Sequence, residues 1–244
     1  MEAARIFVGF DQREASAYHV FCQSVISRAS IPVSFHPIAK NMLDGFDGQA
    51  DGSNAFTVSR YLVPLLCDFN GWAIFADGDM VCDTDIAQLW AQRPLHNAVA
   101  LVKHDYKTKS ARKYVGTAME APNVDYPRKN WSSLLIWNCA HYANRVLTKE
   151  YVQKVPSAFL HRFQWLEDTA IGTVFAGWNY LIGEDAPSSA AIYHYTLGVP
   201  GIKHYADDHA SWHWHKELLT ALECAGEDPR KIVQRAQERV GAIR

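Results

Sequence analysis

The sequence is most informative at Trp72-Ala73-Ile74-Phe75-Ala76-Asp77-Gly78-Asp79-Met80-Val81, an apolar run that ends in two carboxylates separated by one glycine. Such a run is typical of a buried strand. Because strand side chains alternate, Asp77 and Asp79 are expected to point the same way at its carboxyl end. Gly78 is expected to let a ligand approach the backbone between them. The pattern predicts a site for Mg²⁺ or Mn²⁺ shared with a diphosphate, and the alternative is a turn with two solvated aspartates.

Length and composition indicate one α/β domain over residues 1–244, with C-terminal helices from about residue 215. The formal net charge is only -2. This balance gives no reason to expect nucleic acid or an anionic membrane as a partner.

Five cysteines are scattered singly, and no CxxC pair is present. An odd number cannot all pair within one chain, so a reduced cytoplasm is the simplest compartment. The first apolar segment, 5–10, is too short and too early for a signal peptide, and no apolar run approaches eighteen residues. We therefore predict a cytoplasmic protein without a transmembrane segment.

Apolar periodicity predicts the order strand, helix, strand, helix, strand, which is the opening of an α/β sheet. The predicted strands are 6–10, 33–38, 72–76, 99–103 and 130–138. The predicted helices are 14–29, 57–67 and 84–91, and a Gly-, Asp- and Asn-rich loop covers 41–54.

Candidate ligand-binding residues fall where these strands end, which is where open α/β sheets bind ligands. Asp11 follows the first strand, and Lys103 closes the strand after the aspartate pair. Arg60 precedes the central strand, where a guanidinium could reach a phosphate. For each of the three, the alternative is an ordinary surface side chain.

Five of the eleven histidines lie between residues 193 and 215. His209 and His213 have the i, i+4 spacing of a zinc protease, but Ala210 stands where that enzyme needs its glutamate. His194 differs because it ends a predicted strand. Its neutral imidazole could complete a metal shell begun by two carboxylates.

Short motifs then recur in an order typical of one enzyme family: Phe10-Asp11, Ser59-Arg60-Tyr61, Asp77-Gly78-Asp79, Tyr126-Pro127-Arg128-Lys129-Asn130-Trp131-Ser132-Ser133, Trp165-Leu166-Glu167-Asp168, Trp178-Asn179 and His194-Tyr195-Thr196-Leu197-Gly198. Over residues 5–205 the chain resembles GT-A-fold glycosyltransferases. It is most similar to small bacterial and phage-type members of the retaining group that includes glycogenin and the bacterial lipopolysaccharide galactosyltransferases. The resemblance implies a Rossmann-like mixed sheet flanked by helices.

The resemblance also implies a function. A hexose would pass, with retention, from a nucleoside-diphosphate sugar such as a UDP-sugar to a carbohydrate or other small acceptor. Mn²⁺ or Mg²⁺ would be held by Asp77, Asp79 and His194. Asp11 would lie near the base and Arg60 near the diphosphate or sugar.

Further donor contacts implied by the resemblance are Lys103, Ser132, Ser133 and Gly198. Two departures from the family pattern fall among them. Ser132-Ser133 stands where better-known members have Asn-Ala, and Gly198 is one residue farther from the histidine than their glycine.

A partial negative charge is needed beside the oxocarbenium-like carbon, and Asp168 or Glu167 could supply it. Asp168 aligns with the residue that faces the donor sugar in better-known relatives. The alternative is that both are acids at a helix N-terminus.

Two other functions fit parts of the sequence. Asp77 and Asp79 also resemble the acids of a haloacid-dehalogenase-type phosphatase, although that nucleophile normally follows the first strand. A carbohydrate- or nucleotide-binding module without turnover is the second alternative. If the chain is a transferase, we expect the acceptor surface in segments 105–130 and 195–215, which carry no readable pattern.

Overall fold

The computed structural model describes residues 3–48, 54–186 and 190–223, together with 226, 228, 230, 231 and 234. Its strands are β1 (Ala4–Gly9), β2 (Val33–Ile38), β3 (Trp72–Ala76), β4 (Met80–Cys82), β5 (Val99–Leu101), β6 (Arg112–Lys113), β7 (Ala121–Pro122), β8 (Leu134–Asn138), β9 (Ile171–Thr173), β10 (Tyr180–Leu181) and β11 (Ile192–His194). Its α-helices are α1 (Ala15–Ile26), α2 (Val63–Leu66), α3 (Ala87–Trp90), α4 (Lys149–Lys154), α5 (Ser157–His161) and α6 (Ser211–Leu222).

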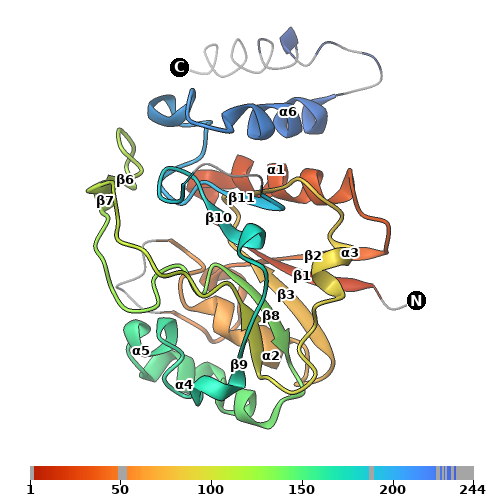
Figure 1. Cartoon of the computed structure of the whole chain (residues 1–244), viewed down its shortest axis with the longest axis vertical. Helices are drawn as coiled ribbons and strands as arrows, with labels where there is room; N and C mark the ends of the chain where they lie inside the picture. Colours follow the sequence, from red (N-terminus) through yellow and green to blue (C-terminus); the bar gives the residue numbers. More distant parts are fainter. Residues whose placement is uncertain are drawn as a thin grey trace.

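The main sheet has six strands in the order β2-β1-β3-β8-β5-β9. β1 is parallel to β2 and β3, whereas β8 is antiparallel to both of its neighbours, β3 and β5. A smaller sheet, β10-β11-β4, lies beside it (Figure 1). The mixed sheet with flanking helices confirms the predicted α/β fold.

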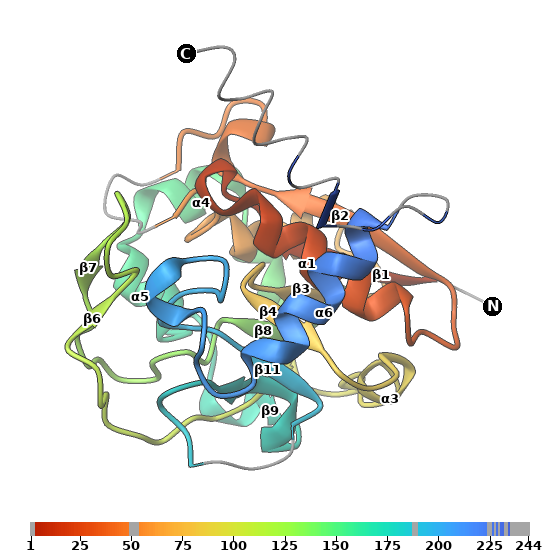
Figure 2. The same ribbon diagram turned by 90° about the horizontal axis from the view of Figure 1, so that it is seen from above.

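Alternating side chains of β3 divide the core into two layers, as the two-residue period of a strand requires. Ala73 and Phe75 pack with buried residues of α2, α4 and α5, whereas Ile74 and Ala76 pack with those of α1 and α3. α6 lies against α1 (Figure 2), on the opposite side of the molecule from α4 and α5 (Figure 1). β3 is therefore buried on both faces and leaves only its ends for binding.

Several elements are shorter than their sequence patterns predict. The expected helix 57–67 is a 3-10 turn, Ser59–Leu62, followed by the four-residue α2, with Pro64 in its first turn. The expected helix 84–91 is reduced to α3, because the Asp85 carboxylate accepts a hydrogen bond from the backbone of Ala87 at 2.9 Å and starts the helix there.

The predicted strand 130–138 was wrong at its start. β8 begins at Leu134, and Asn130 has a φ of +61°, a left-handed conformation that no strand residue adopts. Residues 130–133 form a turn instead, and the Ser133 carbonyl accepts a hydrogen bond from the backbone of Asp77 at 2.8 Å. Because β8 runs antiparallel to β3, this turn lies at the carboxyl end of β3.

The C-terminal helix α6 starts before residue 215, and most of the predicted helical residues after 223 lie outside the described part of the chain. Among the described residues, no helix combines the length and apolarity needed to cross a bilayer.

Candidate functional site

Asp77, Asp79 and His194 meet just beyond the carboxyl end of β3. Each offers one ligand atom, and these atoms lie within 4.8 Å of one another. His194 reaches this point at the end of β11, because β11 runs antiparallel to β4 and pairs with Met80. The Nε2 atom of His194 lies 3.3 Å from Oδ1 of Asp79. The structure thus brings together the three residues that the sequence assigned to one site.

The orientation of His194 is set by Asn179. The Asn179 amide nitrogen donates to the Ser133 hydroxyl at 2.8 Å, which leaves its Oδ1 to face Nδ1 of His194 at 2.9 Å. Nδ1 therefore carries a ring proton, which leaves Nε2 as the ring nitrogen available to bind a metal. This is the arrangement in which histidine binds a metal.

The Arg60 side chain is buried, and its Nη1 lies 2.8 Å from Oδ1 of Asp77. It also donates to the backbone carbonyls of Ser132 and Thr57, at 2.8 and 2.9 Å. Burial raises the pKa of Asp77 above its ordinary value; Arg60 opposes this shift, and the Asp79 carboxylate adds to it. Arg60 therefore holds Asp77 in place, while its predicted contact with a diphosphate stays a prediction.

The donor set fits a divalent cation. In the described residues, Oδ1 of Asp79 is buried and accepts no hydrogen bond, which is costly unless a positive charge faces it. Two carboxylates and one neutral imidazole suit Mn²⁺ or Mg²⁺ with open coordination positions.

Gly78 has a packing role that the sequence did not predict. A Cβ atom at this position would lie 2.6 Å from the carbonyl oxygen of Gly9. Gly78 is therefore required by the close contact with the end of β1, and the approach of a ligand at this position stays a prediction.

Asp11 lies in a separate hollow of about 220 Å³, lined by residues 10–13, 40–41 and 54–55. Its carboxylate forms an ion pair with Arg13 at 2.6 Å and accepts a hydrogen bond from the backbone of Ala55 at 3.0 Å. Burial alone would raise the pKa of Asp11, but the Arg13 and Ala55 hydrogen bonds lower it below its usual range. Asp11 is thus an anion at neutral pH.

Ser132, Ser133 and Gly198 are buried within the protein. The Ser132 hydroxyl bonds to Nδ1 of His161 at 2.8 Å, and the Ser133 hydroxyl donates to the Asn130 carbonyl at 2.7 Å. A Cβ at Gly198 would lie 2.3 Å from the Tyr205 ring. Each residue thus has a packing role, and their donor contacts stay predictions.

Lys103 is exposed, with its Nζ 5.8 Å from the centre of the Trp131 ring. Asp168 pairs with Arg128 and has a side chain that is 81% exposed. Asp168 and the exposed Glu167 lie just before β9, which is parallel to β5 and pairs with it from its first residue. These acids therefore lie where β5 and β9 begin, whereas Asp77 lies where β3 ends. The structure therefore does not bring these acids into the group of candidate metal ligands, Asp77, Asp79 and His194, which we call the metal-binding group.

Two residues near the metal-binding group were missed. Burial raises the pKa of Glu14 to about 8, and the charges of Asp79 and Asp11 add to the shift. Burial lowers the pKa of Lys113, an effect that the nearby carboxylates of Asp79 and Asp77 oppose. Glu14 starts a helix and Lys113 belongs to a two-residue strand, so no sequence pattern distinguished them.

Solved structures identify the class of fold. The galactosyltransferase LgtC, in complex with donor and acceptor sugar analogues, superposes with a TM-score of 0.57 at 12% identity, over 91% of this chain and 98% of that chain. The bifunctional glycosyltransferase WbbM superposes with a TM-score of 0.57 at 14% identity over 88% of this chain, which spans only 51% of WbbM. The fold is that of the GT-A glycosyltransferases.

A sequence relative gives the family. Protein CDI of Arabidopsis thaliana is 40% identical over 225 residues, which cover 88% of this chain and 85% of that protein. The chain belongs to the family of Protein CDI. No family model matches the chain.

Proposed function

We propose that this chain is a metal-dependent glycosyltransferase that moves a hexose from a nucleoside-diphosphate sugar, a UDP-hexose in our assignment, to a carbohydrate or other small acceptor with retention. One observation carries the proposal: the ligand atoms of Asp77, Asp79 and His194 converge within 4.8 Å at the edge where β3 ends. A GT-A fold with such a site suits a diphosphate that completes the metal shell.

The proposed roles of the residues follow from their contacts. A bound divalent ion would stabilise the charge of the departing nucleoside diphosphate as a Lewis acid. Asp77 and Asp79 would hold that ion, with Arg60 fixing Asp77 and Asn179 fixing His194. Asp11 and its hollow would receive the nucleoside, since a carboxylate is a suitable acceptor for base or ribose donors.

The acid beside the anomeric carbon stays assigned to Asp168 or Glu167, and family resemblance is the only support for this assignment. Loss of such a charge should lower the single-turnover rate by about 100-fold and leave donor affinity unchanged. If Asp168→Asn and Glu167→Gln both keep a single-turnover rate near that of the wild type, neither acid lies beside the anomeric carbon. Their role would then be in surface contacts such as the ion pair between Asp168 and Arg128.

The phosphatase alternative is less compatible with the geometry. β1, α1 and β2 precede β3, and the Arg60 ion pair at 2.8 Å would weaken Asp77 as a nucleophile. The product that forms distinguishes the three functions: a glycosylated acceptor for the transferase, free phosphate for the phosphatase and no product for the binding module.

The test is incubation of the protein with a panel of nucleotide sugars, Mn²⁺ and simple sugars, read by mass spectrometry, with Asp79→Asn as the matched control. We expect Mn²⁺-dependent release of nucleoside diphosphate and a glycosylated product only with the wild type. Hydrolysis of p-nitrophenyl phosphate without any sugar transfer would support the phosphatase, and donor binding without product would support the binding module.

A further inference from the structure

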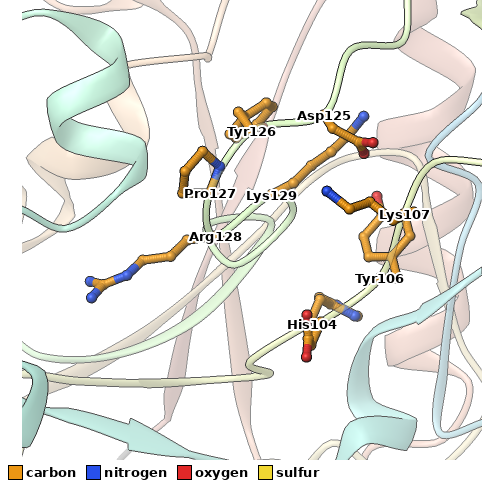
Figure 3. A pocket seen from close by; sticks show the side chains of 9 residues that line it. His104, Tyr106, Lys107, Asp125, Tyr126, Pro127, Arg128 and Lys129 are labelled. Carbon is orange, nitrogen blue, oxygen red and sulfur yellow. The ribbon is translucent and has the colours of Figure 1, made fainter.

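A hollow of about 300 Å³ lies between segments 104–107 and 125–129. Figure 3 shows His104, Tyr106 and Lys107 on one side and the 125–129 turn on the other, with the Arg128 side chain pointing away. Its lining is aromatic and charged, with few aliphatic side chains. Such a surface suits a ligand that carries many hydroxyl groups.

A second hollow of about 350 Å³ adjoins the first. Its lining comes from segments 102–105, 175–177 and 185–186 and from Tyr180, so His104 and Asp105 are common to both hollows. Two hollows that share lining residues are neighbours, and we call the pair the 104 groove. Each half alone is at the lower limit for a small-molecule site, so one monosaccharide would fill only one half.

The 104 groove adjoins the metal-binding group. The Asn130 carbonyl, next to the first hollow, accepts hydrogen bonds from the Ser133 hydroxyl and, at 3.4 Å, from the same Asn179 amide that orients His194. Phe175, in the second hollow, directly precedes the 3-10 turn Ala176–Asn179 that carries this amide. Asn179, which orients His194, is thus hydrogen-bonded beside the first hollow and follows Phe175 of the second hollow by four residues.

Two electrostatic interactions indicate which end of the 104 groove lies toward the metal-binding group. The Tyr126 hydroxyl lies within range of the charges on Arg60 and Asp77, and the His104 ring lies within range of His194.

Phe175 marks the outer end of the 104 groove, where its side chain is 68% exposed. An exposed aromatic ring beside charged side chains is a platform for the C–H face of a sugar ring, whose hydroxyls then meet the polar lining. Asp105 and Lys103 lie in the same hollow and provide an acceptor and a donor for such hydroxyls.

We propose that the 104 groove binds the acceptor and that the acceptor is an oligosaccharide of at least two sugar units. The unit that receives the hexose lies in the hollow between His104 and Tyr126, and the next unit stacks on Phe175. This inference rests on the proposed function, because it assigns the acceptor side of the same site.

The test is saturation-transfer NMR titration in the presence of UDP and Mg²⁺, because paramagnetic Mn²⁺ would broaden the signals of the bound sugars. The probes are the methyl glycosides of glucose, galactose and mannose and their matched di- and trisaccharides. Phe175→Ala is compared with Tyr142→Ala, which removes an 80% exposed ring from another part of the surface. UDP affinity is measured by calorimetry for each protein.

We expect a disaccharide to bind the wild type about 10-fold more tightly than its monosaccharide, and Phe175→Ala to remove that difference. Tyr142→Ala should leave the difference unchanged, and neither variant should change UDP affinity. The inference is overturned if mono- and disaccharides bind equally, if none of the sugars binds, or if Phe175→Ala weakens UDP instead. Failure of the wild type to bind UDP with Mn²⁺ would contradict the proposed function itself.

Discussion

His194 can serve as a metal ligand at Nε2 only in one tautomer, and Asn179 fixes that tautomer. Its Oδ1 faces Nδ1 of His194 at 2.9 Å, and its own orientation depends on the Ser133 hydroxyl. The orientation of His194 therefore depends on Asn179 and Ser133, which are not among the three candidate ligands.

Asn179→Ala should weaken Mn²⁺ binding by about 10- to 100-fold, because the imidazole loses the acceptor that orients it. Mn²⁺ affinity can be measured by calorimetry, with Asn97→Ala as the control, since the Asn97 amide nitrogen donates to the Thr169 carbonyl at 2.8 Å at the surface. His194→Ala should be at least as damaging as Asn179→Ala, whereas His213→Ala should do little. Equal losses for His194→Ala and His213→Ala would show that the histidine assignment is wrong.

A second histidine, His161, should make the free energy of unfolding depend on pH. Burial lowers the pKa of His161 from 6.5 to about 3, and the charge of Arg60 adds to the shift. Between these values the unfolded chain binds a proton that the folded chain does not, so the free energy of unfolding rises with pH. This contribution is present above about pH 6.5 and is lost as the pH falls toward 3.

Urea unfolding at pH 7 and pH 5 should show a change in the free energy of unfolding on acidification that is less destabilising in His161→Gln than in the wild type by about 1–2 kcal/mol. The exposed His19 provides the matched variant His19→Gln, which should keep the wild-type loss. A loss in His161→Gln equal to that of the wild type would mean that His161 is protonated in the folded protein.

At the scale of elements, the position of the hairpin β6–β7 is fixed by hydrogen bonds to the distant segment 197–205. The backbone of Tyr114 donates to the Leu197 carbonyl at 2.7 Å, and that of Val115 donates to the Tyr205 hydroxyl at 3.0 Å. Leu197 is three residues beyond His194 in the chain. These contacts place Lys113 within range of the Asp77 and Asp79 carboxylates.

Lys113→Met should lower UDP affinity in the presence of Mn²⁺ by about 10-fold, because an ammonium at this point can pair with a diphosphate oxygen. Lys109→Met, which removes an exposed lysine from the segment leading to the same hairpin, should bind UDP like the wild type. Calorimetry measures both, and unchanged affinity in Lys113→Met would place the diphosphate away from the hairpin.

The sequence predicted elements where a periodic pattern was long enough. The apolar run of β3 and the alternation that aligns Asp77 with Asp79 are local properties, and both were visible. The turn before β8 was not, because Arg128 and Asn130 both adopt left-handed conformations and neither is a glycine. β6 has two residues and takes its position from Leu197, a contact that no local pattern encodes.

At the scale of the molecule, the site is assembled from segments far apart in the chain. Asp11 and Glu14 follow β1, Asp77 and Asp79 follow β3, and His194 ends β11. The order of motifs indicated that these segments belong to one enzyme family. It could not indicate that Asp168 would lie before β9 with its side chain exposed, because that depends on how β9 pairs with β5.

The central claim is that Asp77, Asp79 and His194 hold a divalent cation that in turn binds a nucleoside diphosphate. The direct measurement is calorimetric titration of UDP with and without Mn²⁺ into the wild type and Asp79→Asn, with circular dichroism to verify that both are folded. We predict that the wild type binds UDP only when Mn²⁺ is present, and that folded Asp79→Asn shows no Mn²⁺-dependent binding. Equal UDP binding by the two proteins in Mn²⁺ would contradict the account.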